Sequence, residues 1–101
     1  MRHHIFNAEI AKKIGLVEAI LLYNIEFCVD TYKASNKNFY RGRYWVYISA
    51  KEYQEFFNYL SQKQITRALK RLVDDDWLFK DESWYALSDK FTGFIDNIKG
   101  E

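Results

Sequence analysis

The chain has 101 residues, of which 49% are hydrophobic and 19% aromatic, so it can bury a core and is not a disordered protein. Its 15 basic and 14 acidic residues leave a net charge of +1. Any electrostatic function must therefore come from how charge is arranged along the chain. We expect one domain over residues 1–101.

Cys28 is the only cysteine, which excludes an intramolecular disulfide, and its apolar surroundings predict a buried thiol in a reducing compartment. The longest apolar run, residues 19–23, is far shorter than the roughly 20 residues of a membrane span. No signal-peptide pattern opens the chain. We expect a cytoplasmic protein without membrane contact.

The first third of the chain predicts two helices. Asn7 can cap a short helix over residues 8–14, which Gly15 would end. Residues 16 to about 32 are apolar almost all round, which predicts a long central helix that is buried or shared with a partner. Residues 34–43 lack periodicity and predict an exposed basic loop, and residues 44–48 alternate as a strand does.

Two helix starts lie twelve residues apart between residues 49 and 73. Ser49 with Glu52 and Ser61 with Gln64 have the spacing of a capping box, in which a side chain and the backbone satisfy each other. On the helix that begins at Ser61, the 3.6-residue period predicts a core stripe of Ile65, Leu69 and Leu72. Residues 49–73 therefore predict a helix-turn-helix.

Residues 77–87 predict a β-hairpin, since two aromatic-rich segments flank a polar turn at residues 81–83. Ser88 can cap a last helix with Phe91, Phe94, Ile95 and Ile98 on one face and Gly100 after its end. The fold we expect is mainly α with a small three-stranded sheet: a winged helix-turn-helix in which the hairpin is the wing. The aromatic residues could stack on single-stranded nucleic acid, but strand and helix periodicity favours core packing for Trp45, Tyr47, Trp77, Trp84 and Tyr85. Tyr40 and Tyr44, beside Arg41 and Arg43, are the exceptions, which we expect to be exposed.

The helix from Ser61 to Val73 carries four basic residues and no acidic one, a local charge of +4. The second helix of a helix-turn-helix enters the major groove of DNA, and residues near its start meet the base edges. A solvated basic face is the alternative interpretation. We expect base contacts from Gln62, Lys63, Thr66 and Arg67, and phosphate contacts from Lys70, Arg71, Lys37, Arg41 and Arg43. Gln64 is a further residue that we expect to bind DNA.

Several of these segments resemble the winged-helix domain of phage and plasmid replication initiators. The similarity rests on GLVEAILLYNIEF, on Gly42-Arg43-Tyr44-Trp45-Val46, and on SQKQITRALKRL, and it covers roughly residues 7–87. The resemblance implies a winged helix that binds operator or replication-origin DNA, with residues 61–72 as recognition helix. A role in replication initiation or in transcription control would follow.

One departure from that family favours another function. Where its members usually have a glycine-containing break, this chain has Asp74, Asp75 and Asp76, and with Asp81 and Glu82 residues 74–82 carry five acids and one base. Such a segment would repel phosphates. The alternative is therefore a protein-binding winged helix, for example a phage-encoded inhibitor of a nucleic-acid enzyme, with these acids as its contact surface.

Enzyme chemistry has little support in the sequence. His3 and His4 are adjacent and have no further ligand to complete a metal site, and Cys28 has no neighbouring base and should have a raised pKa. We expect no catalysis, metal or cofactor. A homodimer is plausible, since helix-turn-helix proteins commonly pair to read two half-sites.

Overall fold

The computed structural model describes residues 6–99, with side chains up to residue 97. Five α-helices lie in this range: α1 Ala8–Ile14, α2 Leu16–Ser35, α3 Ala50–Phe56, α4 Gln62–Asp74 and α5 Asp89–Lys99. The chain is therefore mainly helical with small antiparallel sheets. The predictions for His3, His4, Gly100 and the side chain of Ile98 lie outside the described residues.

A three-stranded antiparallel sheet has the order β3-β5-β4, with strands Val46–Tyr47, Trp84–Leu87 and Leu78–Asp81. The predicted hairpin is confirmed, because Leu78 pairs with Leu87 and Asp81 with Trp84. Only Glu82 and Ser83 lie between the two strands, and Glu82 takes a positive φ of 56°. The predicted strand over residues 44–48 is divided between β3 and a second, smaller sheet.

That second sheet corrects the expectation of an irregular loop over residues 34–43. Helix α2 continues to Ser35, and residues 39–44 form a hairpin of β1 Phe39–Tyr40 and β2 Arg43–Tyr44. Its two turn residues, Arg41 and Gly42, both have positive φ, 53° and 78°, as a type I′ turn requires. The turn chemistry of Arg-Gly is weaker than that of Asn-Gly, which is why the pattern was not recognised in the sequence.

Local capping fixes most helix starts as the sequence predicted. Asn7 Oδ1 accepts from the amides of Glu9 and Ile10. At α4 both halves of the capping box form, with Ser61 Oγ accepting from the Gln64 amide at 3.0 Å and Gln64 Oε1 accepting from the Ser61 amide at 2.9 Å. At α3 only one half of the predicted capping box forms among the described residues, with Ser49 Oγ accepting from the Glu52 amide at 3.4 Å.

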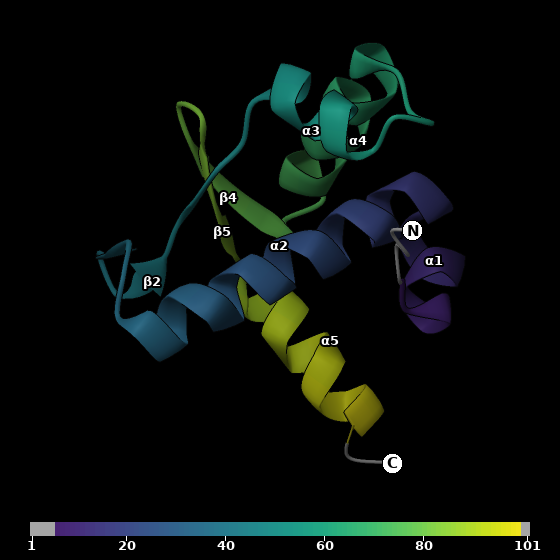
Figure 1. Ribbon diagram of the computed structural model, residues 1–101. Helices are drawn as coiled ribbons and strands as arrows, with labels where there is room; N and C mark the ends of the chain where they lie inside the picture. Colours follow the sequence, from purple (N-terminus) through teal and green to yellow (C-terminus); the bar gives the residue numbers. More distant parts are fainter. Residues whose placement is uncertain (1–5, 100–101) are drawn as a thin grey trace.

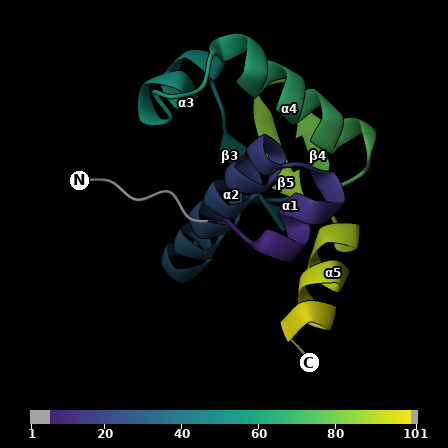
Figure 2. The same cartoon turned by 90° about the vertical axis from the view of Figure 1, so that its right-hand side faces the viewer.

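Helix α2 runs through the middle of the molecule, with α3 and α4 on one side of it and α5 on the other (Figure 1 and Figure 2). Its residues 19–22 and 25 are buried in a cluster that also contains residues from α1, α4 and α5 and from β3, β4 and β5, and α3 packs against this cluster with partly buried side chains. Among the described residues, no helix combines the length and the apolar character needed to cross a membrane. This arrangement leaves one face of α4 in solvent.

Candidate nucleic-acid interface

Helix α4 is strongly two-sided. Ile65, Ala68, Leu69 and Leu72 are buried against α2 and α3, which accounts for the regular apolar spacing in the sequence. The opposite face is exposed along the whole helix, and it carries Lys63, Arg67, Lys70 and Asp74. The predicted basic face therefore forms as a single stripe, with an aspartate added at its C-terminal end.

The first half of this stripe is free of internal contacts. Gln62, Lys63, Thr66 and Arg67 are exposed, and none of their side chains forms a hydrogen bond or an ion pair with another described residue. Free donors near the start of an exposed helix can reach the edges of bases in a major groove. Gln64 differs, since its side-chain oxygen is used in the capping box.

The second half of the stripe is partly neutralised by the protein itself. Lys70 Nζ lies 2.7 Å from Asp74 Oδ2 in an exposed ion pair. A phosphate could take the place of the Asp74 carboxylate at small cost in free energy. Arg71 lies to one side, and its Nη1 is 3.3 Å from Oε2 of Glu18, whose side chain is only 9% exposed. Arg71 therefore joins α4 to α2. If Arg71 turned to a phosphate, the buried Glu18 carboxylate would lose its cation, and this cost argues against the predicted phosphate contact.

A groove of about 390 Å³ runs between α4 and the sheet. Thr66 and Lys70 line it from α4, and Lys80 and Tyr85 line it from the β4–β5 hairpin. The Lys80 ammonium is 5.9 Å from the centre of the Tyr85 ring. Lys80 was not among the residues selected from the sequence, although its pairing with Tyr85 across the hairpin indicates that it shares the face next to α4.

The predicted basic loop lies elsewhere. Figure 1 shows β2 at the C-terminal end of α2, well separated from α4. Arg43 is bound within the fold, with Nη1 donating to the Leu87 carbonyl at 3.0 Å, Nη2 donating to Asp89 Oδ1 at 3.1 Å, and its guanidinium 4.5 Å from the Phe79 ring. Lys37 and Arg41 are exposed. The three residues therefore do not extend the basic face of α4.

The five acidic residues between residues 74 and 82 form two groups. Asp74, Asp75 and Asp76 end α4, where Asp76 takes a left-handed φ of 65° and the Trp77 amide donates to the Leu72 carbonyl at 2.9 Å. This is the geometry of a helix end that usually has glycine. Asp81 and Glu82 are at the tip of the hairpin. All five carboxylates are exposed.

Of the five aromatic residues predicted to pack in the core, two were predicted wrongly and Trp45 is only half-buried. Trp77 and Tyr85 are buried as expected, but Tyr47 and Trp84 are exposed and face each other across β3 and β5 with ring centres 5.5 Å apart. Strand alternation contained the signal, since Val46 and Ile48 face the core and Tyr47 between them must face outward. Tyr40 is exposed as expected, whereas Tyr44 is half-buried and packs on Phe39.

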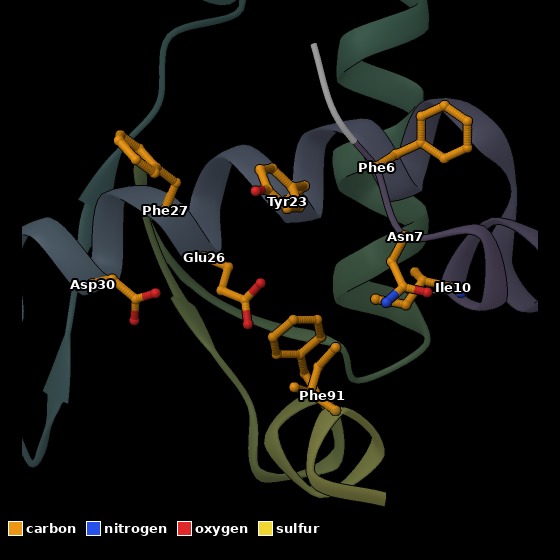
Figure 3. A pocket seen from close by; sticks show the side chains of 9 residues that line it. Phe6, Asn7, Ile10, Tyr23, Glu26, Phe27, Asp30 and Phe91 are labelled. Atoms are coloured by element: carbon orange, nitrogen blue, oxygen red, sulfur yellow. Dashed lines mark hydrogen bonds between the residues drawn. The ribbon is translucent and has the colours of Figure 1, made fainter. Parts of the chain in front are cut away.

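A separate pocket of about 390 Å³ lies between α1, α2 and α5 (Figure 3). Ile10, Phe91 and Ile95 are buried at this site, while Phe6, Tyr23 and Phe27 remain exposed. Glu26 and Asp30 add carboxylates from α2, and the Glu26 side chain extends toward α5. No side chain of the basic stripe on α4 lines it.

Metal ligands are not clustered in the described part of the chain. Within residues 6–99, no group of three or more His, Cys, Asp or Glu residues is placed to hold a metal ion. Burial raises the pKa of the Cys28 thiol, the direction expected from the sequence, and Cys28 packs against the core. A thiol of this kind is a poor nucleophile.

Comparison with known proteins gave no further assignment. No protein-family model, curated protein or solved structure matches the chain. Any proposal for the function of this protein therefore rests on the geometry of α4 and its neighbours.

Proposed function

We propose that this chain is a winged-helix protein that binds double-stranded DNA in a sequence-specific manner, with α4 as recognition helix and the β4–β5 hairpin as wing. The observation that carries the proposal is the exposed start of α4, where Gln62, Lys63, Thr66 and Arg67 have no partner among the described residues. A helix that is 13 residues long and buried on its other face presents these groups as one rigid surface. Control of replication or of transcription is the role that this activity would serve.

Charge along α4 supports an approach of DNA to its first half. The aspartates 74–76 lie at the far end of the helix, about 20 Å from its start at 1.5 Å per residue. Lys63 and Arg67 therefore meet the duplex first, and of the three aspartates only Asp74, which is paired with Lys70, comes near the phosphates. Lys80 and Thr66 in the groove beside the hairpin offer further contacts to the backbone of the duplex.

A selection from random duplexes, followed by titration at increasing salt, tests the proposal. Lys63, Arg67, Lys70 and Lys80 are available to DNA, whereas Glu18 holds Arg71. Four cations give a slope of about −3.6 for log affinity against log salt, so raising salt from about 50 to about 200 mM should weaken binding about 150-fold. Absence of any salt-dependent duplex binding would exclude the proposal.

Variants separate base reading from phosphate contact. Replacing Arg67 by Ala should cost about 1 to 3 kcal/mol and relax the sequence preference, whereas Lys70→Ala should weaken all duplexes alike. Lys51→Ala, on exposed α3, is the matched control for loss of a surface charge. Equal effects of the first two variants on every sequence would contradict the assignment of Arg67 to the bases.

A protein-binding winged helix, such as a phage-encoded inhibitor of a nucleic-acid enzyme, is the second candidate. It is favoured by the exposed carboxylates of Asp75, Asp76, Asp81 and Glu82, which form no ion pair with the described residues. The variant Asp75→Lys distinguishes the two functions. It should strengthen non-specific DNA binding if α4 binds DNA, and should abolish function if the acids contact a protein partner.

A further inference from the structure

A pocket of about 330 Å³ lies between the β1–β2 hairpin and the β4–β5 hairpin. Its lining is largely aromatic and comprises Asn38, Phe39, Tyr40, Trp45, Asp81 and Trp84. The two hairpins occupy the same side of the molecule, at the left of Figure 1. The site does not include any residue of α4.

The pocket is held in shape by the backbone of both hairpins. The Trp45 amide donates to the Asn38 carbonyl at 2.9 Å, and Trp45 Nε1 donates to the Tyr40 carbonyl at 2.8 Å. On the other hairpin, Trp84 pairs with Asp81 across the strands and rests edge-on against Tyr47. The rings are therefore positioned before any ligand arrives, which lowers the entropic cost of binding.

Aromatic surface at this site is unusually open. Phe39, Tyr40 and Trp84 are 56%, 58% and 39% exposed, although each could gain free energy by burial. Exposed apolar side chains that gather at one place, rather than singly, mark binding surfaces. The pocket therefore needs an occupant whose chemistry fits both the rings and the polar groups beside them.

Asp81 indicates the charge of that occupant. It is the one charged residue that lines the pocket, and its carboxylate forms no ion pair with the described residues. Aromatic faces carry negative potential and attract cations, and Arg41 of this chain already lies with Cζ 5.1 Å from the centre of the Tyr40 ring. Lys37 and Arg41 do not line the pocket, whereas Asp81 does, so a phosphate inside the pocket would meet a carboxylate.

We propose that this pocket binds the cationic side chain of an arginine or lysine in a basic segment of a partner protein. The aromatic rings would surround the aliphatic and cationic parts of the side chain, and Asp81 would neutralise its charge. The pocket is a second binding site, independent of the DNA surface proposed for α4. A nucleobase stacked on the same rings is the competing occupant.

Indole N–H resonances of Trp45 and Trp84 in a ¹⁵N-labelled sample report occupation of this pocket directly. The ligands are capped Gly-Gly-X-Gly-Gly peptides in which X is arginine, lysine or norleucine, and in parallel a short oligothymidylate. The arginine and lysine peptides should shift both indole resonances, whereas norleucine, which has no charge, should shift them much less. The resonance of buried Trp77 should stay unchanged.

Two variants locate the interaction. Asp81→Asn should weaken the cationic peptides about two- to fivefold, and Trp84→Ala should weaken them at least as much. Asp75→Asn removes a carboxylate outside the pocket and Lys63→Ala alters the proposed DNA surface, so both should bind the peptides normally. Thermal unfolding of each variant shows whether its fold is intact.

Three results would overturn the proposal: equal shifts from norleucine, no effect of Asp81→Asn on the affinity of the cationic peptides, or oligothymidylate moving the indoles when the cationic peptides do not. The last result would identify a stacking site for single-stranded nucleic acid. If Lys63→Ala lost duplex binding but bound the peptides normally, the result would bear on the DNA surface of α4 and not on the pocket.

Discussion

Asn24 connects the central helix to α3 through a single side chain. Its Oδ1 accepts a hydrogen bond of 2.6 Å from the Tyr53 hydroxyl, and the Cys28 thiol lies 3.9 Å from the same oxygen. Burial is the main reason why the pKa of Tyr53 is raised far above its usual value of 10. Folding therefore favours the neutral phenol. The contribution of Tyr53 to the stability of the fold is fully present below pH 10 and is lost as the pH rises above 10.

We expect Tyr53→Phe to lower the free energy of unfolding at pH 7 by about 1 kcal/mol, because the amide oxygen of Asn24 loses its best donor. The same variant should lose part of the decline in stability above pH 10. Denaturant titrations at pH 7 and at pH 10.5 measure both effects. Tyr40→Phe, at an exposed position, is the control, and an unchanged alkaline decline in Tyr53→Phe would refute the role of this phenol.

Asp76 occupies a backbone position that suits glycine. Its left-handed φ of 65° carries a steric cost for a residue with a side chain, and its carboxylate lies at the negative end of the helix dipole of α4. Asp76→Gly should therefore raise the free energy of unfolding by about 0.5 to 1 kcal/mol. Asp75→Gly, at a φ of −91°, should not stabilise. Thermal unfolding of the two variants decides, and equal effects would argue against strain at Asp76.

In helix α4, an acidic residue would compete with the proposed DNA ligand for a lysine side chain. Asp74 holds Lys70 in an exposed pair one helical turn away. Asp74→Asn frees that ammonium and removes a negative charge from the interface, so duplex affinity should rise severalfold at low salt and converge with wild type at high salt. Fluorescence anisotropy with a labelled duplex at two salt concentrations measures this difference. Asp75→Asn, which leaves Lys70 paired, provides the comparison.

Helices and the main hairpin were predictable from the sequence, because their signals are local. The capping of Ser61 by Gln64 and the apolar spacing of Ile65, Leu69 and Leu72 depend on residues within one or two turns. The β1–β2 hairpin was missed, since a two-residue Arg41-Gly42 turn has no strong composition signal. Arg43 and Arg71 could not be assigned either, as their partners Leu87, Asp89 and Glu18 are more than forty residues away along the chain.

The Glu18 side chain requires a glycine at position 15, between α1 and α2. Gly15 ends α1 and begins α2 with a φ of 110°, and a Cβ at this position would collide with the Glu18 carboxylate. That carboxylate in turn receives Arg71 from α4. A glycine, a buried acid and a basic residue on another helix therefore form one structural unit.

Helix α2 presents exposed apolar side chains on the surface of the protein. Phe27 is 63% exposed, and Tyr23 and Leu16 are exposed as well. If this surface pairs two chains, Phe27→Asp should shift the protein toward monomer in sedimentation at micromolar concentration. Phe39→Asp changes a residue of similar exposure on the hairpin and should leave the association state as it was. A wild-type protein that is already monomeric would exclude dimerisation through α2.

The three tryptophans divide between two environments, and this gives the protein separate optical reporters. Trp77 is 3% exposed, with Phe94 packed on it and the Lys90 ammonium 4.5 Å from its ring centre, so its emission should follow loss of the core. Trp84 is exposed and Trp45 is half-buried, so a collisional quencher such as acrylamide should reach both more readily than Trp77. Quenching and wavelength shifts measured on single-tryptophan variants should therefore separate events at the surface from unfolding.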